Sequence, residues 1–346
     1  MPSIDVIVPC YRYGRFLPDS LGSILSQNVD NLRVAVIDNA SGDDSVEVAK
    51  AIAKNDPRVT VIAHDKNIGQ VGNYNSGLDW VEADYLIISD ADDILPAGAL
   101  ERGISIMERD KSVVFCHGTE LQIPFEAGKI PPEASEPGED SWTVVPGIDF
   151  IRDVAVNYKF VGATTVIRRT SAQRSAGRYV EGLKYAFDSN MWFRLAALGN
   201  VAETKSVQGI RRIHTSQITE QYRRDPSLDC IERYNNMAHF FLQNEGTLPE
   251  ARELLKETEK AIAVSAFWLG MDLERLGEVD KANACVDVSM ALSRRAIMPR
   301  ILKQAMLGRM PLSSLARYLS SASRERGAEA IRKSREGLTF PILRMR

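Results

Sequence analysis

Three carboxylates follow an apolar run, and their type and spacing suit the binding of a divalent cation. Asp90, Asp92 and Asp93 come after the run 85–88, which reads Tyr-Leu-Ile-Ile. Clustered carboxylates repel one another as bare anions, so a cation among them is stabilising, and oxygen-rich sites favour Mg²⁺ or Mn²⁺. The alternative is a solvated acidic turn that caps a helix starting near Pro96. The residues alone leave both interpretations open.

The surrounding sequence indicates which elements would position these carboxylates. Short β-branched or apolar runs predict strands at 4–8, 33–37, 59–62 and 85–89. Helical spacing and turn signals predict helices over 16–27, over 46–54 and up to residue 81. Strands that alternate with such helices favour a doubly wound, mainly parallel α/β sheet. Ligands of these sheets bind beyond the carboxyl ends of the strands.

Several polar and aromatic residues fall at that expected binding edge. They are Pro9 to Tyr11, Asp38, Asn67 to Gly69 and Asp90 to Asp93. Tyr11 can stack on a nucleobase, and Asp38 can accept a hydrogen bond from the ring N–H of uracil or thymine. A core tyrosine and a helix-capping aspartate are the alternatives for these two. Gly69 suits either the close approach of a ligand or a simple sharp turn.

Four ordered motifs carry a resemblance to a known family. They are Val6-Ile7-Val8-Pro9-Cys10-Tyr11, Val36-Ile37-Asp38-Asn39-Ala40-Ser41 with Asp44-Ser45, Asn67-Ile68-Gly69 with Asn75-Ser76-Gly77, and Asp90-Ala91-Asp92-Asp93. In these motifs the chain resembles the family 2 glycosyltransferases of the GT-A fold, a large inverting group. The segments 182–195 and 211–214 extend the resemblance, which covers roughly residues 3 to 220.

The resemblance implies a site for a nucleotide-diphosphate sugar. Asp90 would contact the ribose, and Asp92 would bind Mn²⁺ or Mg²⁺, with Asp93 as an extra ligand. The other donor-binding positions would be Pro9, Tyr11, Asp38, Asn67 and Gly69. His214 would return to the metal or the diphosphate, and Arg212 would pair with phosphate oxygens. The alternatives are a surface or core histidine and a solvated arginine.

The resemblance also implies a catalytic base. Inverting transfer needs a group that removes the acceptor hydroxyl proton, and Asp188 occupies the position of the family's catalytic carboxylate. Many relatives have an acidic pair here, whereas this chain has Phe187 before the aspartate. An additional role for Asp188 is the N-cap of a helix over 189–198.

Composition and pattern predict two domains in this 346-residue chain, a catalytic domain over 1–221 and a helical region over 222–346. The helices expected in the second are 228–243, 249–277 and 279–292. Four scattered cysteines argue for a reducing compartment. The first strand starts too early for a signal peptide, and no run approaches the ~18 apolar residues of a membrane span. We therefore expect a cytoplasmic protein, or one peripheral to the inner face of a membrane.

The segment 124–146 is rich in Pro, Glu, Gly and Ser and predicts a loop. In this fold such insertions flank the acceptor side, so Trp142 is a candidate for contact with a sugar. An ordinary exposed loop is the alternative, and we favour it.

Charge is unevenly distributed along the chain. Residues 290–346 contain 13 basic and 3 acidic side chains, a net charge of +10, so the preceding 289 residues carry −13. This tail could rest on an anionic membrane, hold an acidic partner or be a solvated helix. Leu312, Leu315, Ala316 and Leu319 recur at helical spacing, which favours packing within the fold or in a homodimer. Few aromatics accompany the basic residues, which argues against nucleic-acid binding.

Together these features predict a metal-dependent, inverting glycosyltransferase. It would move a sugar from a nucleotide-diphosphate donor, UDP-linked by expectation, to a hydroxyl of a glycan or lipid-linked glycan in polysaccharide synthesis of the bacterial type. One alternative is a sugar nucleotidylyltransferase, whose first strand should open into a Gly-rich, Arg-containing loop rather than into Pro9-Cys10-Tyr11. The other is a catalytically silent glycan-binding module of the same fold.

Overall fold

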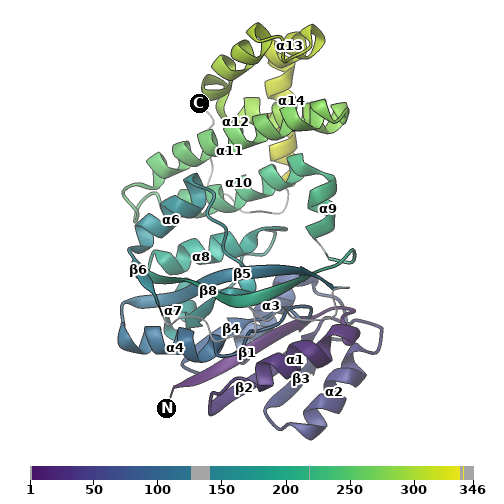
Figure 1. The fold of residues 1–346 in the computed structure, drawn as a ribbon. Helices are drawn as coiled ribbons and strands as arrows, with labels where there is room; N and C mark the ends of the chain where they lie inside the picture. The colour runs from purple at the N-terminus through teal and green to yellow at the C-terminus, as the bar shows by residue number, and fades with distance from the viewer. Residues whose placement is uncertain (1, 126–140, 218, 336–337, 339–346) are drawn as a thin grey trace. The chain divides into compact units, whose positions relative to one another are not determined.

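A computed structural model describes residues 2–125, 141–217, 219–335 and 338 (Figure 1). The chain divides into two compact units, which are described separately below. The first comprises Met1–Ile151, Lys159–Val180 and Met191–Thr215, and the second comprises Arg152–Tyr158, Glu181–Asn190 and Ser216–Arg346. The boundary predicted between residues 221 and 222 stays a prediction.

The first unit is built on a single mixed sheet in the order β3-β2-β1-β4-β7-β5-β8-β6. Its strands are β1 (Ser3–Cys10), β2 (Asn31–Asp38), β3 (Val59–Ala63), β4 (Tyr85–Ile88), β5 (Val113–Pro124), β6 (Thr143–Val145), β7 (Ile167–Arg169) and β8 (Asn200–Ile213). Strands β1 to β4 pair in parallel, as do β5 and β8. Strand β7 is antiparallel to both β4 and β5, and β6 is antiparallel to β8.

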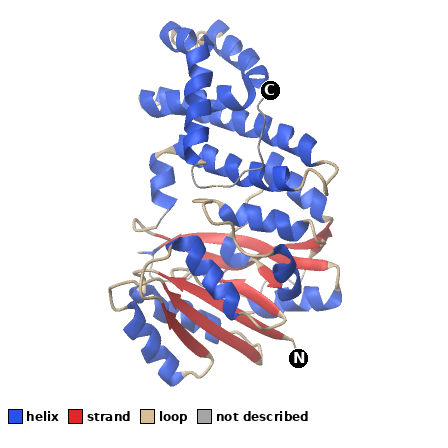
Figure 2. Cartoon of the chain, turned by 180° about the vertical axis from the view of Figure 1, so that it is seen from behind, coloured by secondary structure: helices blue, strands red, loops and turns tan. Residues whose placement is uncertain are grey.

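Helices cover both faces of this sheet (Figure 2). They are α1 (Leu17–Leu25), α2 (Ser45–Asn55), α3 (Gly69–Trp80), α4 (Ala99–Arg109), α6 (Gly147–Val156), α7 (Thr170–Ala176) and α8 (Phe187–Ala196), of which α6 and α8 cross from one unit to the other. Because both faces are covered, β1 is apolar from Ile4 to Cys10 except at Asp5, and all of these residues are buried. The predicted doubly wound, mainly parallel α/β sheet is confirmed.

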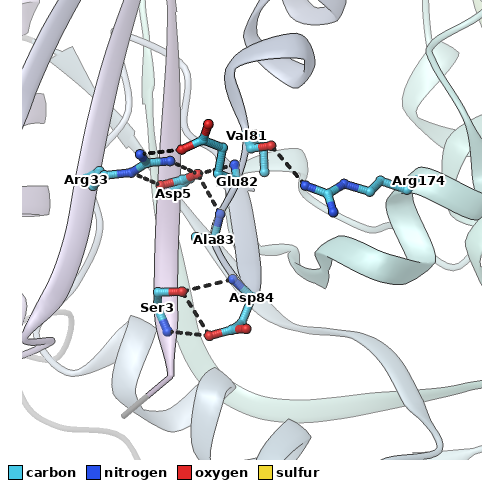
Figure 3. A network of polar contacts seen from close by, with 8 residues as sticks. All are labelled: Ser3, Asp5, Arg33, Val81, Glu82, Ala83, Asp84 and Arg174. Carbon is cyan, nitrogen blue, oxygen red and sulfur yellow. Dashed lines mark hydrogen bonds and ion pairs between the residues drawn. The ribbon is translucent and has the colours of Figure 1, made fainter.

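The N-terminal end of β1 is fastened by a polar network around Asp5 (Figure 3). The Asp5 carboxylate is fully buried and accepts hydrogen bonds from Arg33 on β2, at 2.8 Å to each oxygen. It also accepts from the backbone N–H groups of Glu82 at 2.8 Å and Ala83 at 2.9 Å, just before β4. One side chain thus joins three parts of the sheet at the end opposite the carboxyl tips.

The second unit is helical, as predicted. Its helices are α9 (Thr219–Arg224), α10 (Pro226–Gln243), α11 (Ala251–Arg275), α12 (Val279–Met306), α13 (Leu312–Leu319) and α14 (Ser321–Ser334). A buried cluster that includes Phe267 of α11, Ile297 of α12 and Tyr318 of α13 forms its core. Leu315 and Leu319 pack against this cluster, so two members of the predicted α13 stripe contribute to packing inside the unit.

Two helix boundaries differ from the expectation. Helix α8 begins at Phe187, so Asp188 lies in its first turn and the expected N-cap role is wrong. In α12 the predicted end at 292 coincides with non-helical backbone at Ser293 (φ −154°, ψ 76°), and a second helical segment that was not predicted continues to Met306. None of the helices in the described part of the chain is long and apolar enough to cross a membrane.

Candidate functional site

The loop after β1 presents an exposed aromatic ring. Tyr11 is 40% exposed, so the alternative of a core tyrosine is wrong. The Arg12 guanidinium lies 5.2 Å from the centre of the Tyr11 ring. Arg12 has a positive φ of 60° and is held there by its backbone N–H, which donates to Ser41 Oγ at 2.9 Å. The ring is therefore presented by a loop that the neighbouring β2 loop fixes.

Asp38 ends β2 and shapes the loop that follows it. Its side chain is buried, and its two oxygens accept hydrogen bonds from the backbone N–H of Ser41, at 3.0 Å, and from the Ser41 hydroxyl. This is a local turn and not a helix cap, because α2 begins at Ser45 and its N-cap position is Asp44.

A pair of asparagines shapes the loop before α3. Asn39 accepts from the backbone N–H of Ile68 at 2.8 Å, and it donates to Asn67 Oδ1 at 3.1 Å and to the Gly69 carbonyl at 3.2 Å. Asn67 in turn accepts from the Gly69 N–H at 2.8 Å. Gly69 has φ +78°, which favours glycine and confirms the turn that was one of its two interpretations. The sequence analysis missed Asn39, although its place directly after Asp38 at a strand tip was a usable signal.

The acidic motif after β4 is buried. Asp92 and Asp93 are each 5% exposed, so the solvated acidic turn is wrong. The hydroxyl of Tyr74 donates to Asp90 Oδ1, and the Asp93 N–H donates to the Asp90 carbonyl at 2.9 Å. Among the described residues, Asp93 Oδ1 has no hydrogen-bond partner. Burial raises the pKa of Asp93 well above its usual range, and the charges of Asp92 and Asp90 add to this.

The end of β8 brings His214 to this motif. His214 Nε2 lies 3.0 Å from Asp92 Oδ2, and the histidine is 8% exposed. Its ring stacks on Phe16, with centroids 4.6 Å apart, and meets the edge of Tyr13 at 5.5 Å. Two residues that are 122 positions apart in sequence are therefore paired inside an aromatic setting, and the surface alternative for His214 is wrong.

Arg212, on the same strand, is buried and binds protein groups. Its Nε donates to the Asp92 carbonyl, its Nη2 to the Phe16 carbonyl at 3.2 Å, and its Nη1 to Asp19 Oδ2 at 2.9 Å. The solvated alternative is wrong because the residue is 5% exposed. These contacts fasten the Asp92 backbone to the segment after β1, a positioning role that the sequence analysis did not foresee.

These residues fit a divalent cation that is shared with a ligand. Asp92 Oδ2 and His214 Nε2, which lie 3.0 Å apart, offer an oxygen and a nitrogen as ligands. Asp93 Oδ1 is buried, has no hydrogen-bond partner among the described residues, and offers a second oxygen. Within the described ranges, no group of three or more His, Cys, Asp or Glu side chains is arranged to hold a metal by itself. The donor set therefore fits Mn²⁺ or Mg²⁺ only if the ligand's own oxygens complete the coordination.

Asp188 belongs to the second unit, in the first turn of α8. The residue before the helix, Ala186, has φ +54°, and Asn190 donates to the Asn236 carbonyl of α10 at 3.0 Å. Asn236 in turn donates to the Tyr185 carbonyl at 2.7 Å. Hydrogen bonds from the amide side chains of Asn190 and Asn236 thus hold the chain on both sides of Asp188.

The segment 124–146 is only partly described, because residues 126–140 lie outside the described ranges. Trp142 is partly buried and packs against the core of the sheet. Its assignment to an ordinary exposed loop is therefore wrong, and nothing in the structure tests its contact with a sugar.

The chain was compared with known proteins. Residues 5–132 match glycosyl transferase family 2. An uncharacterized glycosyltransferase of Haemophilus influenzae is 25% identical over 223 residues, which are 64% of this chain and 68% of that protein. The GalNAc(5)-diNAcBac-PP-undecaprenol beta-1,3-glucosyltransferase of Campylobacter jejuni is 34% identical over 101 residues, 29% of this chain and 33% of that protein.

Solved structures with the same fold share little sequence. S. aureus TarS 1–349 in complex with UDP-GlcNAc has a TM-score of 0.63 at 16% identity, over 99% of this chain and 95% of that chain. The mannosyltransferase PcManGT from Pyrobaculum calidifontis, in complex with GDP-Man and Mn²⁺, has a TM-score of 0.55 at 16% identity, over 95% of this chain and 87% of that chain. Residues 5–132 therefore match a glycosyl transferase family 2 domain, the chain is similar to proteins named as glycosyltransferases, and it has the GT-A fold.

Proposed function

We propose that the protein is a metal-dependent, inverting glycosyltransferase that uses a nucleotide-diphosphate sugar. The observation that carries the proposal is the Asp92–His214 pair, with Nε2 and Oδ2 3.0 Å apart, beside a buried Asp93 oxygen without a described partner. A buried carboxylate without full pairing is costly unless a ligand uses it. Support also comes from the position of this pair at the carboxyl ends of β4 and β8.

The donor proposed is a UDP-sugar. Asp38 is an acceptor-only carboxylate at the tip of β2, which suits the imide N–H of uracil, and Tyr11 offers an exposed ring for stacking. Pro9, Asn67 and Gly69 would border the nucleotide, and Asp90 would bind the ribose. The neighbours with the same fold are seen with different donors, TarS with UDP-GlcNAc and PcManGT with GDP-Man, so the choice of UDP rests on Asp38 and Tyr11.

Asp92 and His214 would hold the cation, with Asp93 next to them. A bound Mn²⁺ or Mg²⁺ would offset the negative charge that develops on the departing diphosphate. The protein's own contribution is to hold Asp92 in place, through the Arg212 bond to its carbonyl and the aromatic packing of His214. Arg212 was predicted to bind phosphate, and its hydrogen bonds to the Asp92 and Phe16 carbonyls support a role in positioning Asp92.

Asp188 is the proposed base. Asp188 lies in the first turn of a helix, where the helix dipole favours the ionised form of a carboxylate. Only the ionised form can accept the proton of the attacking hydroxyl. The acceptor proposed is a hydroxyl of a glycan or lipid-linked glycan, in line with the undecaprenol-linked substrate named for the Campylobacter relative. Synthesis of a bacterial-type polysaccharide at the cytoplasmic face of a membrane is the corresponding role.

The test is a panel of nucleotide sugars incubated with the full chain in Mn²⁺ or in EDTA, with release of the nucleoside diphosphate as the readout. We expect release from a UDP-sugar in Mn²⁺ and little in EDTA. Formation of a nucleotide sugar from UTP and a sugar phosphate would instead identify a nucleotidylyltransferase. Glycan binding without turnover on any donor would identify a silent module.

A further inference from the structure

Apolar side chains are exposed on the second half of α12. Beyond the break at Ser293, Leu302 is 47% exposed and Met306 is 87% exposed, whereas Ile297 and Ile301 on the same segment are fully buried. Leu302 and Met306 are one turn apart and therefore share a face. Leu307, which follows the helix, is 51% exposed. An apolar face that points to solvent at the end of a helix indicates a surface with a binding partner.

A basic pocket lies at the break in the same helix. It has a volume of about 610 Å³ and includes Met290, Leu292 and Met298 in its lining, together with Arg294, Arg295 and Arg324 of α14. The three arginines are exposed, and none forms an ion pair or side-chain hydrogen bond with another described residue. Guanidinium groups around an apolar floor match a ligand that joins a phosphate to a hydrocarbon.

In the described part of the tail, several other basic residues are already paired. Arg326 donates to both oxygens of Asp287 of α12, at 2.6 Å and 3.0 Å, and Arg317 lies 3.7 Å from the same carboxylate. Arg332 pairs with Glu329 at 2.7 Å. The unpaired positive charge is therefore concentrated at the pocket and on the adjacent end of α12, where Lys303 and Arg309 are also exposed.

A second copy of the chain and an anionic lipid bilayer are the two partners considered for this surface, and its positive charge favours the bilayer. In a symmetric dimer the same patch would face itself, and the exposed Arg294, Arg295 and Arg324 of the two copies would repel one another. An anionic bilayer offers phosphates to the arginines and an apolar interface to Leu302 and Met306.

We propose that the second half of α12, together with Arg324, docks this protein on the surface of an anionic lipid bilayer. The guanidinium groups of the pocket take lipid phosphates, and Leu302 and Met306 enter the interfacial region. The membrane surface is thereby assigned to α12, since Leu315 and Leu319 of α13 are committed to the core of the unit. The inference does not depend on the donor or on glycosyl transfer.

The test is co-sedimentation of the full chain with vesicles. One set consists of phosphatidylcholine with an equal share of phosphatidylglycerol, and the other of phosphatidylcholine alone. We expect binding only to the anionic set. Arg294→Gln/Arg295→Gln/Arg324→Gln should lower the partition coefficient roughly 10²-fold, because each basic residue near such a surface contributes about 1 kcal/mol. Leu302→Ser/Met306→Ser should weaken the binding that persists at high salt.

The matched control is Arg275→Gln/Arg332→Gln/Lys333→Gln, which removes the same charge from exposed side chains that pair with Asp272 and Glu329. It should keep most of the binding. The proposal is overturned if the control loses as much as the pocket variant, if neutral vesicles bind equally, or if the parent is a dimer that the pocket variant dissociates. All variants change exposed side chains, and thermal unfolding checks that each is folded.

Discussion

Two buried acidic sites lie at opposite ends of the parallel half of the sheet, and they are satisfied in different ways. At the N-terminal end, Asp5 receives two hydrogen bonds from Arg33 and two from backbone N–H groups, so its carboxylate is fully paired. At the carboxyl end, Asp92 faces His214, and Asp93 keeps a buried oxygen without a partner among the described residues. Both sites are buried, but only the second keeps a carboxylate oxygen without a partner in the described part of the chain.

The contrast distinguishes Asp5, a carboxylate that stabilises the fold, from Asp92 and Asp93, carboxylates that we propose bind a ligand. Burying a carboxylate costs free energy, and protein donors offset that cost fully at Asp5. At Asp93 the offset is partial, because one oxygen has no partner in the described part of the chain, and the proposed function assigns that oxygen to a ligand. Substitution at Asp5 should therefore change stability, and substitution at Asp92 should change ligand binding and transfer.

The largest effect is expected from Asp92→Asn. The variant loses the charged oxygen that faces His214, and we expect transfer to fall by about 10³-fold or more, since loss of one electrostatic stabiliser at a reacting centre costs about that much. UDP affinity should drop in Mn²⁺ and stay nearly unchanged in EDTA. Isothermal titration of UDP in both buffers measures the difference.

Asp65→Asn is the matched control, because Asp65 is an exposed carboxylate in the loop after β3. It should leave both the turnover and the metal dependence of UDP binding at parental values. If Asp92→Asn keeps the parental metal dependence, Asp92 is not a ligand and the contrast with Asp5 fails.

The opposite outcome is expected from Asp5→Ala. Two backbone N–H groups and Arg33 lose their acceptor, and a buried donor left unpaired costs about 1–3 kcal/mol, so the free energy of unfolding should fall by roughly 2–4 kcal/mol. Urea unfolding measures this. Ser3→Ala, at the exposed Asp84 contact of the same end, should cost less than about 1 kcal/mol. Loss of UDP affinity at full stability in Asp5→Ala would contradict a purely structural role.

Asp188→Asn tests the proposed base, with a smaller effect. The amide keeps the size of the side chain but cannot take a proton, so turnover should fall by roughly 10²-fold while UDP affinity and the unfolding midpoint stay at parental values. Single-turnover kinetics with a saturating donor separate the chemical step from binding. Near-parental turnover would assign the base to another residue and leave Asp188 as a helix-terminal charge.

The strands and the residues at their tips could be predicted from the sequence. Contacts between residues far apart in the chain could not. Apolar runs and turn residues predicted where the strands lie. They also predicted that Asp38, Asn67 and Asp90 to Asp93 lie at the carboxyl edge of the sheet. The role of Arg212 was not foreseeable, because the carbonyls it binds belong to residues 120 and 196 positions away. The helix end predicted at 292 coincides with the break at Ser293, but the helical segment that follows it, up to Met306, was not predicted.

Helix α10 shows how a polar pattern can mislead. Glu232, Asn235, Asn236 and His239 recur at helical spacing, which in sequence is typical of a solvated face. All four are buried, at 1%, 0%, 0% and 8% exposure, and Asn236 holds the segment that carries Asp188. Only the tertiary structure reveals that this polar stripe faces inward.

Glu232 offers the last and smallest test, since it is a further buried carboxyl and one of its oxygens has no partner among the described residues. Burial raises its pKa from 4.5 to about 7, against a smaller opposing effect of Lys184. The folded state therefore keeps a proton that the unfolded state releases above pH 4.5, and the free energy of unfolding falls as the pH rises from there to about 7. Glu232→Gln removes this penalty, so it should stabilise the protein at pH 8 by on the order of 1–2 kcal/mol more than at pH 5. Urea unfolding at both values measures it, with the exposed Glu253→Gln as control. If Glu232→Gln changes the free energy of unfolding equally at pH 5 and pH 8, Glu232 resembles Asp5, a carboxylate whose charge the fold already stabilises.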